Sequence, residues 1–336
     1  HVDVPDYAVF LYPPHDLAFA NLMAQVVNQY QLDIMHVHYA IPYSVYALLA
    51  REMANRSFYL VTTLHGTDVT VLGEAPSLKK IIELGINNSD AVTAVSDSLV
   101  EETKEKFTVN VPIQRIYNFV DPYEYRKKEV SQLRLKYASP EEKILLHVSN
   151  FRFVKRPKDV VSVFEKVQRK IPAKLLLVGA GPELPSIKRY VQELGLSSKV
   201  IFLGKQRDVT TLYSLADLLL IPSEKESFGL VAIEAMSSGV PVIASNAGGL
   251  PEVIDHGKTG FLSPVGDVSD MAKNALRLLQ DPTMYQLFSV QAVEKVKKEF
   301  AMERIVGQYE SLYRRLLSRG GPDNIGQEKE SSCSYS

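Results

Sequence analysis

The sequence predicts an α/β protein built from two doubly wound domains. Its 336 residues exceed what one hydrophobic core usually serves, so two domains of ordinary size are expected. Short β-rich runs alternate with helical patterns from end to end, which is typical of parallel sheets with crossover helices. Apolar residues make up 46% and charged residues 23% of the chain, an average globular usage that argues against disorder and against a fibrous architecture.

The first domain is predicted at 1–120. Its strand candidates are AVFLY, DIMHVHY, FYLVTTL, AVTAVS and PIQRIY, with helical segments at 15–30, 42–55, 76–88 and 97–107. The sequence does not begin with Met, and its first residues resemble the lead-in to a strand inside a domain. We therefore expect this domain to lack its N-terminal portion.

The second domain is predicted at 143–300, after a charged and poorly periodic connection at 121–142. Its strands are KILLHVS, AKLLLVG, KVIFLG, DLLLIP and VPVIAS, and a helix at 157–170 has apolar residues at helical spacing. An apolar stripe at 301–318 predicts a C-terminal helix that packs back toward the first domain. The polar sequence at 319–336 predicts a disordered tail.

Composition limits the partners and the location. The net charge is −1 at pH 7 with no basic stripe, which argues against nucleic acid as a partner. Cys333 is the only cysteine, so there is no disulfide framework, and a reducing cytosol fits. No apolar run approaches the roughly 18–20 residues of a membrane span, and HVDVPDY lacks the pattern of a signal peptide. We expect a cytoplasmic protein, for which the sequence leaves homodimer formation open.

Two nucleotide-binding motifs are present only in part. GAGPEL follows a strand as a dinucleotide fingerprint would, but Leu184 stands where the third glycine is needed and no acidic residue ends the next strand. GKT at 257–259 resembles the end of a P-loop without its glycine cradle. Neither a nicotinamide enzyme nor an ATPase is favoured.

The strongest signal is SEKESFGLVAIE at 223–234, which runs from a strand end into a predicted helix. Ligands of doubly wound sheets bind beyond the carboxyl ends of the strands, and two such domains facing each other would form a cleft. We expect the helix to begin near Ser227, so that backbone N–H groups of 228–230 can receive a diphosphate. Glu226 and Glu234 would then lie within about 80° of each other on one helix face. One carboxylate could contact a sugar and the other a ribose, and the alternative is two ordinary surface acids.

Other strand ends of the second domain carry side chains suited to binding a nucleoside diphosphate. NFRFVKR at 150–156 places cations where a departing nucleoside diphosphate builds up charge, which Arg or Lys can stabilise without a metal. The loop at 204–206 could present backbone to a base ring. The glycines at 248–249 permit close backbone approach, although a tight turn explains them equally well.

The first domain has HVHYA and LHGTD at two strand ends. There His65 could donate a hydrogen bond to a sugar or an acceptor, whereas Thr67 is also a plain helix-capping type. The same motifs could suggest zinc at His36, His38, His65 and Asp68. A closed metal site needs a convergence that the spacing does not show, so no metal is predicted.

Together these motifs resemble the retaining GT-B glycosyltransferases of family 4. The resemblance rests on Glu226-x7-Glu234 with SFGL, the basic loop, GAGPE, GGLPEVIDHGKTGF and YNFVD, and it spans nearly the whole chain. HVHYAIP, TTLHGTDVTVLG, VSNFR with VKR, FLGKQ and SEKESFGL are similar to the branch that glycosylates L-malate in bacillithiol biosynthesis. This implies two Rossmann-like domains and transfer of N-acetylglucosamine from UDP-N-acetylglucosamine to the L-malate hydroxyl, with retention and with no obligatory metal cofactor.

The resemblance also implies site residues. Glu226 would contact the donor sugar, Glu234 the ribose, and Arg152 with Lys155 the diphosphate. The implied catalytic set is His65, Glu226, Arg152 and Lys155; the donor set is Asn118, Asn150, Gly204, Lys205, Gln206, Ser227, Phe228, Gly229, Leu230 and Glu234; the acceptor set is His38, Tyr39 and Thr67.

The chain departs from the family in two places. Asn150 stands where most relatives have an arginine, with Arg152 shifted by two. The family's glycine-rich loop after its first strand is also absent, so we expect the sequence as given to bind UDP and to turn over poorly.

Two other functions stay open. One is the same transfer to a polysaccharide or lipid-linked glycan. The other is a sugar-nucleotide epimerase of the same fold, which would need an acid and a base placed to move a sugar proton. A chain that only binds nucleotide is a third outcome.

Overall fold

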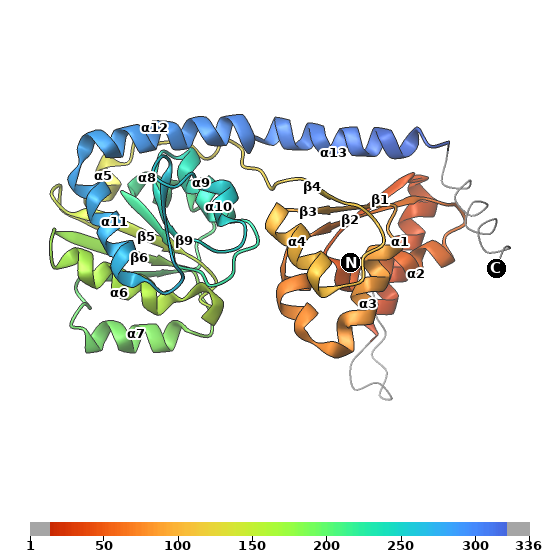
Figure 1. Ribbon diagram of the computed structural model, residues 1–336, viewed down its shortest axis with the longest axis horizontal. Helices are drawn as coiled ribbons and strands as arrows, with labels where there is room; N and C mark the ends of the chain where they lie inside the picture. The colour runs from red at the N-terminus through yellow and green to blue at the C-terminus, as the bar shows by residue number, and fades with distance from the viewer. Residues whose placement is uncertain (1–13, 321–336) are drawn as a thin grey trace. The chain divides into compact units, whose positions relative to one another are not determined.

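The computed structural model describes residues 14–320 and divides the chain into two compact units. The first unit comprises His1–Tyr117 with Val306–Ser336, and the second comprises Asn118–Ile305. Each unit has one parallel sheet with helices packed around it (Figure 1). The predicted strand AVFLY and the predicted tail from 321 onward lie outside the described residues.

The first unit contains a four-stranded sheet of order β1-β2-β3-β4. The strands are β1 (Ile34–His38), β2 (Tyr59–Leu64), β3 (Ala91–Ala94) and β4 (Ile113–Arg115), and the helices between them are α1 (His15–Tyr30), α2 (Val45–Met53), α3 (Pro76–Asn87) and α4 (Asp97–Lys106). Every residue of β2 is buried, as expected for a parallel strand covered on both faces.

The second unit contains a six-stranded sheet of order β10-β9-β8-β5-β6-β7. Its strands are β5 (Lys143–Val148), β6 (Ala173–Val178), β7 (Val200–Gly204), β8 (Leu218–Ile221), β9 (Val242–Ser245) and β10 (Gly260–Ser263). Its helices are α5 (Ser131–Arg134), α6 (Pro157–Gln168), α7 (Leu184–Glu193), α8 (Thr210–Leu215), α9 (Leu230–Ser237), α10 (Leu250–Val253), α11 (Val268–Gln280) and α12 (Pro282–Glu299). The predicted doubly wound α/β class is confirmed.

Helix α6 shows how the pattern produces the core. Val160, Val163, Phe164 and Val167 recur at helical spacing, and each is at most 1% exposed in the core that covers the sheet. Pro157 occupies the first turn, where its missing N–H removes no intrahelical hydrogen bond.

The chain direction across the second sheet reverses between β5 and β8. From β5 the chain proceeds outward to β6 and β7, then returns to β8 and proceeds the other way to β9 and β10. Leu145 and Leu146 of β5 pair with Leu218 and Leu219 of β8. Loops that leave two such neighbouring strands in opposite directions open a crevice at their carboxyl ends, which is where doubly wound sheets bind ligands.

Helix α13 (Met302–Leu317) carries the predicted C-terminal stripe, and its residues from Val306 onward belong to the first unit. There the Tyr313 hydroxyl lies 2.6 Å from Nδ1 of His36 on β1. Leu312 and Leu316 are buried.

Candidate functional site

The carboxyl ends of β5 and β8 bring Lys155 and Glu226 together. Lys155 ends the short helical turn Phe153–Lys155 after β5, and Glu226 lies in the loop after β8. The Lys155 Nζ is 2.5 Å from Glu226 Oε2, and the two side chains are 22% and 15% exposed. The Glu224 amide donates to the carbonyl of Val154 at 2.8 Å, so the two loops are also joined through their backbones. A cation and a carboxylate therefore share the edge of the sheet that the sequence indicated.

Glycines set the position of the Glu226 loop. A Cβ at Gly248 would lie 2.0 Å from the Glu226 carbonyl oxygen, and one at Gly249 would lie 2.6 Å from that of Ser227. The Gly249 amide donates to the Glu226 carbonyl at 2.9 Å. The close approach that these glycines permit is thus to the neighbouring loop of the chain itself.

The glycines of GAGPE have a similar use. A Cβ at Gly179 or Gly181 would lie 1.8 Å from the carbonyl oxygen of Ser149 or Asn150, in the loop that leads to Lys155. Packing against that loop accounts for a glycine pattern that only resembles a dinucleotide fingerprint.

The predicted helix start was wrong by three residues. Helix α9 begins at Leu230 because Gly229 has φ +104°, in the left-handed region that ends helical geometry. Glu226 therefore lies in a loop and shares no helix face with Glu234. Of the residues predicted for donor binding here, Phe228 is 2% exposed and packs on Phe300, whereas Leu230 is 45% exposed.

Glu234 lies in the second turn of α9 and is half-buried. Its Oε2 accepts a hydrogen bond of 2.6 Å from the Tyr213 hydroxyl, and burial raises the pKa of its carboxyl. The phenols of Tyr213 and Tyr125 act in the opposite direction and lower the pKa of this carboxyl. Glu234 is thus no ordinary surface acid, and the two tyrosines are neighbours of it that the sequence analysis missed.

The remaining residues predicted for the second unit are mostly exposed. Arg152, Asn150 and Lys205 are exposed, and so is Gln206, whose amide donates to the Leu203 carbonyl at 2.6 Å. The Arg156 guanidinium forms an ion pair with Asp159 at 2.6 Å and a longer one with Glu224 at 3.9 Å. Asn118, Ser227 and Gly204 are only partly exposed.

In the first unit, the ends of β1 and β2 bring three histidines together. His38 Nδ1 is 2.7 Å from His65 Nε2, and the rings of His36 and His38 stack at 4.7 Å. Burial, with the nearby His38, lowers the pKa of His65 to about 4, so His65 is neutral at pH 7. His36 is committed to Tyr313 and to the Thr63 hydroxyl, at 2.6 and 2.7 Å. His38 and His65 are therefore the pair that remains for a ligand.

Asp68 joins the two loops that carry these histidines. Its carboxylate, fully buried, accepts from the Ala40 amide at 2.8 Å and the Gly66 amide at 3.0 Å. Next to it Thr67 is exposed, and Tyr39 has φ +78°, a strained conformation for a residue other than glycine. The Tyr39 ring lies 5.0 Å from that of His65. Of the predicted acceptor residues, His38 and Tyr39 thus lie against the His65 ring.

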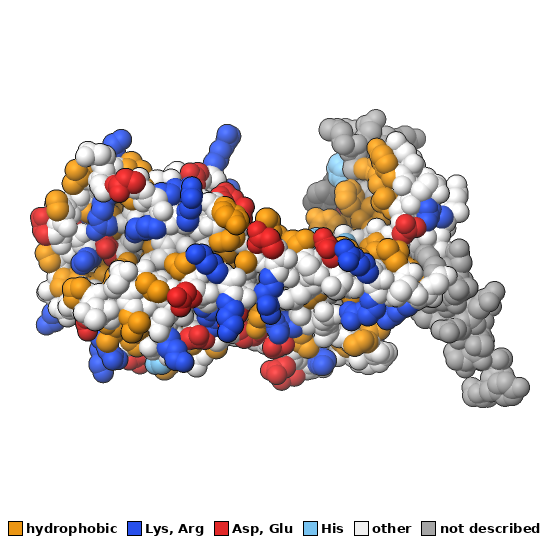
Figure 2. All heavy atoms as spheres, turned by 90° about the horizontal axis from the view of Figure 1, so that it is seen from above, with side chains coloured by type: hydrophobic (Ala, Val, Ile, Leu, Met, Phe, Trp, Pro, Cys, Tyr) orange, Lys and Arg blue, Asp and Glu red, His pale blue; other side chains and the backbone are white. Residues whose placement is uncertain are grey.

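Three further observations concern metal ligands, membrane-spanning helices and surface charge. Among residues 14–320 no group of three or more His, Cys, Asp or Glu side chains is placed to hold a metal ion. Within the same range no helix is long and apolar enough to cross a membrane. On the face that Figure 2 shows, Lys and Arg side chains are interspersed with Asp and Glu.

Known proteins resemble this chain over nearly its whole length. The family model described as Glycosyltransferase Family 4 matches residues 1–124, and that described as Glycosyl transferases group 1 matches residues 131–295. N-acetyl-alpha-D-glucosaminyl L-malate synthase of Bacillus anthracis is 50% identical over 94% of this chain and 83% of its own.

Solved structures agree with the fold. Sucrose-phosphate synthase from Thermosynechococcus elongatus aligns with a TM-score of 0.80 at 25% identity, over 94% of this chain and 83% of that one. The Anabaena protein Alr3699/HepE aligns with a TM-score of 0.78 at 24% identity, over 87% and 81%.

Proposed function

The chain belongs to the family 4 glycosyltransferases, and we propose that it transfers N-acetylglucosamine from UDP-N-acetylglucosamine to the hydroxyl of L-malate with retention of configuration. The identity of 50% with an L-malate synthase over 94% of the chain supports the choice of both substrates. The pairing of Lys155 with Glu226 at the sheet's switch point is the observation that carries the donor half of the proposal.

Lys155 and Glu226 have separate tasks in this reaction. The bond between the sugar's C1 and the diphosphate oxygen breaks, and negative charge grows on that oxygen. The Lys155 ammonium, with Arg152 at the rim of the same loop, stabilises this charge and makes a metal unnecessary. Glu226 accepts hydrogen bonds from sugar hydroxyls, and its ion pair holds the ammonium in place before the donor arrives.

The other donor groups complete the binding of the donor nucleotide. Glu234 accepts from the ribose hydroxyls, the backbone of 227–230 receives phosphate oxygens, and 204–206 lies against the base. Asn118 and Asn150 supply neutral contacts. Because the contacts to the ribose and the base are equal in the ground and transition states, they set affinity rather than kcat. The backbone contacts to the phosphate oxygens strengthen as charge grows there, so they also contribute to kcat.

The acceptor is assigned to the first unit. The malate hydroxyl oxygen forms the new bond to C1 of the sugar. The proton of that hydroxyl passes to the departing phosphate oxygen, and UDP leaves. His65, kept neutral by burial, contacts the donor sugar, while His38, Tyr39 and Thr67 contact malate. These neutral side chains can donate charge-assisted hydrogen bonds to the malate carboxylates. The negative charge of malate is then matched by a cation outside this set of residues.

The reaction is tested by incubating the protein with UDP-N-acetylglucosamine and L-malate, with and without EDTA, and analysing the products by mass spectrometry. We expect N-acetylglucosaminyl-malate in both samples. Product formed only with a glycan acceptor would replace malate by the alternative substrate, and an epimerised UDP-sugar would replace transfer altogether. Loss of product in EDTA would contradict the metal-free mechanism alone.

Thr67→Val is expected to raise KM for malate about tenfold and to leave UDP affinity unchanged. The exposed Thr67 hydroxyl would lose one charge-assisted hydrogen bond to a malate carboxylate, worth about 1.4 kcal/mol. Steady-state kinetics and calorimetry with UDP measure the two quantities. Weaker UDP binding with unchanged malate kinetics would place LHGTD on the donor side.

A further inference from the structure

Two phenols lie beside Glu234. Tyr213 on α8 is fully buried and donates to Oε2 at 2.6 Å, and the Tyr125 ring lies 6.2 Å from that of Tyr213. Burial and the Glu234 charge raise the pKa of Tyr125 to about 12 and raise the pKa of Tyr213 well above its usual value. Both tyrosines therefore keep their protons at pH 7, and Tyr213 donates a hydrogen bond to the carboxylate.

These neighbours leave the Glu234 carboxylate able to accept further hydrogen bonds. A carboxylate has about four lone-pair sites, and the Tyr213 phenol occupies one of them. Among the described side chains, no Lys or Arg forms an ion pair with Glu234. The neutral phenol of Tyr213, with that of Tyr125 beside it, orients the carboxylate without neutralising it, so hydroxyls of a ligand can still bind strongly.

The backbone that carries Tyr125 is fastened to the segment that carries Tyr213. The Ser237 hydroxyl donates to the Tyr125 carbonyl at 2.5 Å. Lys127 Nζ donates to the Ser214 carbonyl at 2.9 Å, and the Lys128 amide to the Ser214 hydroxyl at 3.0 Å. Ser214 directly follows Tyr213, so the two phenols are positioned as one assembly.

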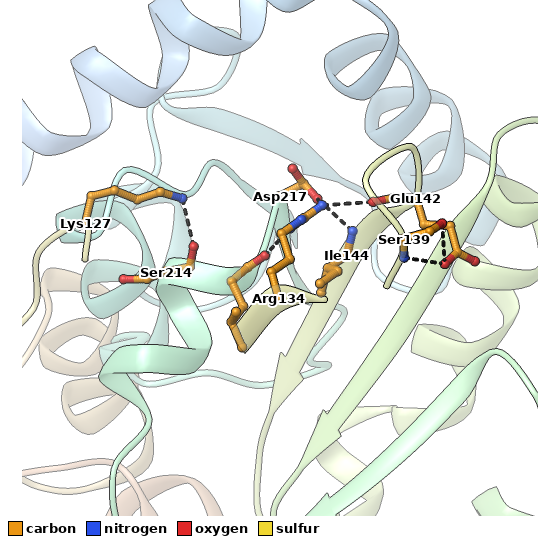
Figure 3. Close-up of polar contacts among 8 residues, drawn as sticks. Lys127, Arg134, Ser139, Glu142, Ile144, Ser214 and Asp217 are labelled. Atoms are coloured by element: carbon orange, nitrogen blue, oxygen red, sulfur yellow. Dashed lines mark hydrogen bonds and ion pairs between the residues drawn. The ribbon is translucent and has the colours of Figure 1, made fainter. Parts of the chain in front are cut away.

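Arg134 anchors the far end of this segment. Its guanidinium donates to the Leu215 carbonyl, to the Glu142 carbonyl at 2.8 Å and to Asp217 at 2.7 Å, as Figure 3 shows. Asp217 also accepts from the Ile144 amide at the start of β5 at 2.7 Å. The segment is thereby attached to the central strands of the second sheet.

We propose that Tyr125 and Tyr213 are positioning residues that orient Glu234 toward the ribose hydroxyls of the donor nucleotide. The proposal rests on the proposed function, which makes the donor a UDP-sugar. Discrimination of the ribose then depends on the two phenols as well as on Glu234 itself.

The test compares UDP with 2′,3′-dideoxy-UDP by calorimetry in the wild type, Tyr213→Phe and Tyr125→Phe. Removing the phenol hydroxyl frees the carboxylate to rotate, so we expect each variant to bind UDP about fivefold more weakly and dideoxy-UDP as before. The donor KM should rise similarly with little change in kcat, because ribose binding is uniform. Tyr190→Phe removes a phenol bonded to Ser162 at 2.9 Å elsewhere in the same unit and should change neither affinity.

The outcomes separate this inference from the proposed function. A wild type that does not bind UDP overturns both. A wild type that prefers UDP to the dideoxy analogue, with the same preference in both variants, overturns only the role of the tyrosines. Equal weakening of both ligands would reduce the tyrosines to packing residues. If Tyr213→Phe fails to fold, Tyr125→Phe, which alters a partly exposed side chain, still decides.

Discussion

Lys155→Ala is expected to lower kcat about a hundredfold or more while the donor KM changes much less. The ammonium lies 2.5 Å from Glu226 at the carboxyl ends of β5 and β8, where the diphosphate is proposed to leave. Charge on the leaving oxygens is larger in the transition state than in the bound donor, so the lost interaction appears mainly in kcat. Steady-state kinetics at saturating malate measure both constants.

Arg156→Ala is the matched control for Lys155→Ala. Arg156 is the next residue, with the same charge, but its guanidinium is engaged by Asp159 at 2.6 Å. We expect only a few-fold effect on kcat. Comparable losses in the two variants would mean that the loop acts as a diffuse basic patch. Thermal melting of both proteins checks that a lost ion pair has not simply unfolded the site.

Much of the fold was predictable because the periodic signals are local. All five strands predicted for the second sheet are present, and their carboxyl ends place Lys155 beside Glu226 as strand-end reasoning suggests. β10 was missed because GFLS is short and begins with a glycine that sits against the Val242 carbonyl. The start of α9 was misplaced because a sequence does not reveal the positive φ of Gly229.

The surroundings of Glu234 were not predictable for a different reason. Tyr125 lies in a charged segment with no periodicity, so nothing local marks it as part of a site. Its partners, Ser237 and Glu234, are brought to it only by the tertiary packing of α9. Asp68 is similar: its residue type suits a cap or a ligand, and only the fold shows it joining the loops after β1 and β2.

Gly248→Ala is expected to lower both stability and activity, whereas Gly195→Ala should cost much less. Both glycines have positive φ, +54° and +69°, so a side chain brings roughly 1–2 kcal/mol of backbone strain at either position. At Gly248 the new Cβ would also lie 2.0 Å from the Glu226 carbonyl oxygen, whereas at Gly195 nothing lies within 4 Å. Relieving that clash must displace the Glu226 loop.

Thermal melting and the transfer assay together test this displacement. We expect Gly248→Ala to melt several degrees below Gly195→Ala, since about 1 kcal/mol corresponds to roughly 2–4 °C in a domain of 150–250 residues. Below its melting temperature, Gly248→Ala should still lose most of its kcat, because Glu226 and its partner Lys155 are no longer held in register. Equal melting temperatures would show that the Glu226 loop moves away from the new Cβ without a loss of stability. A stable variant with full activity would show that the position of the Glu226 backbone does not matter for transfer.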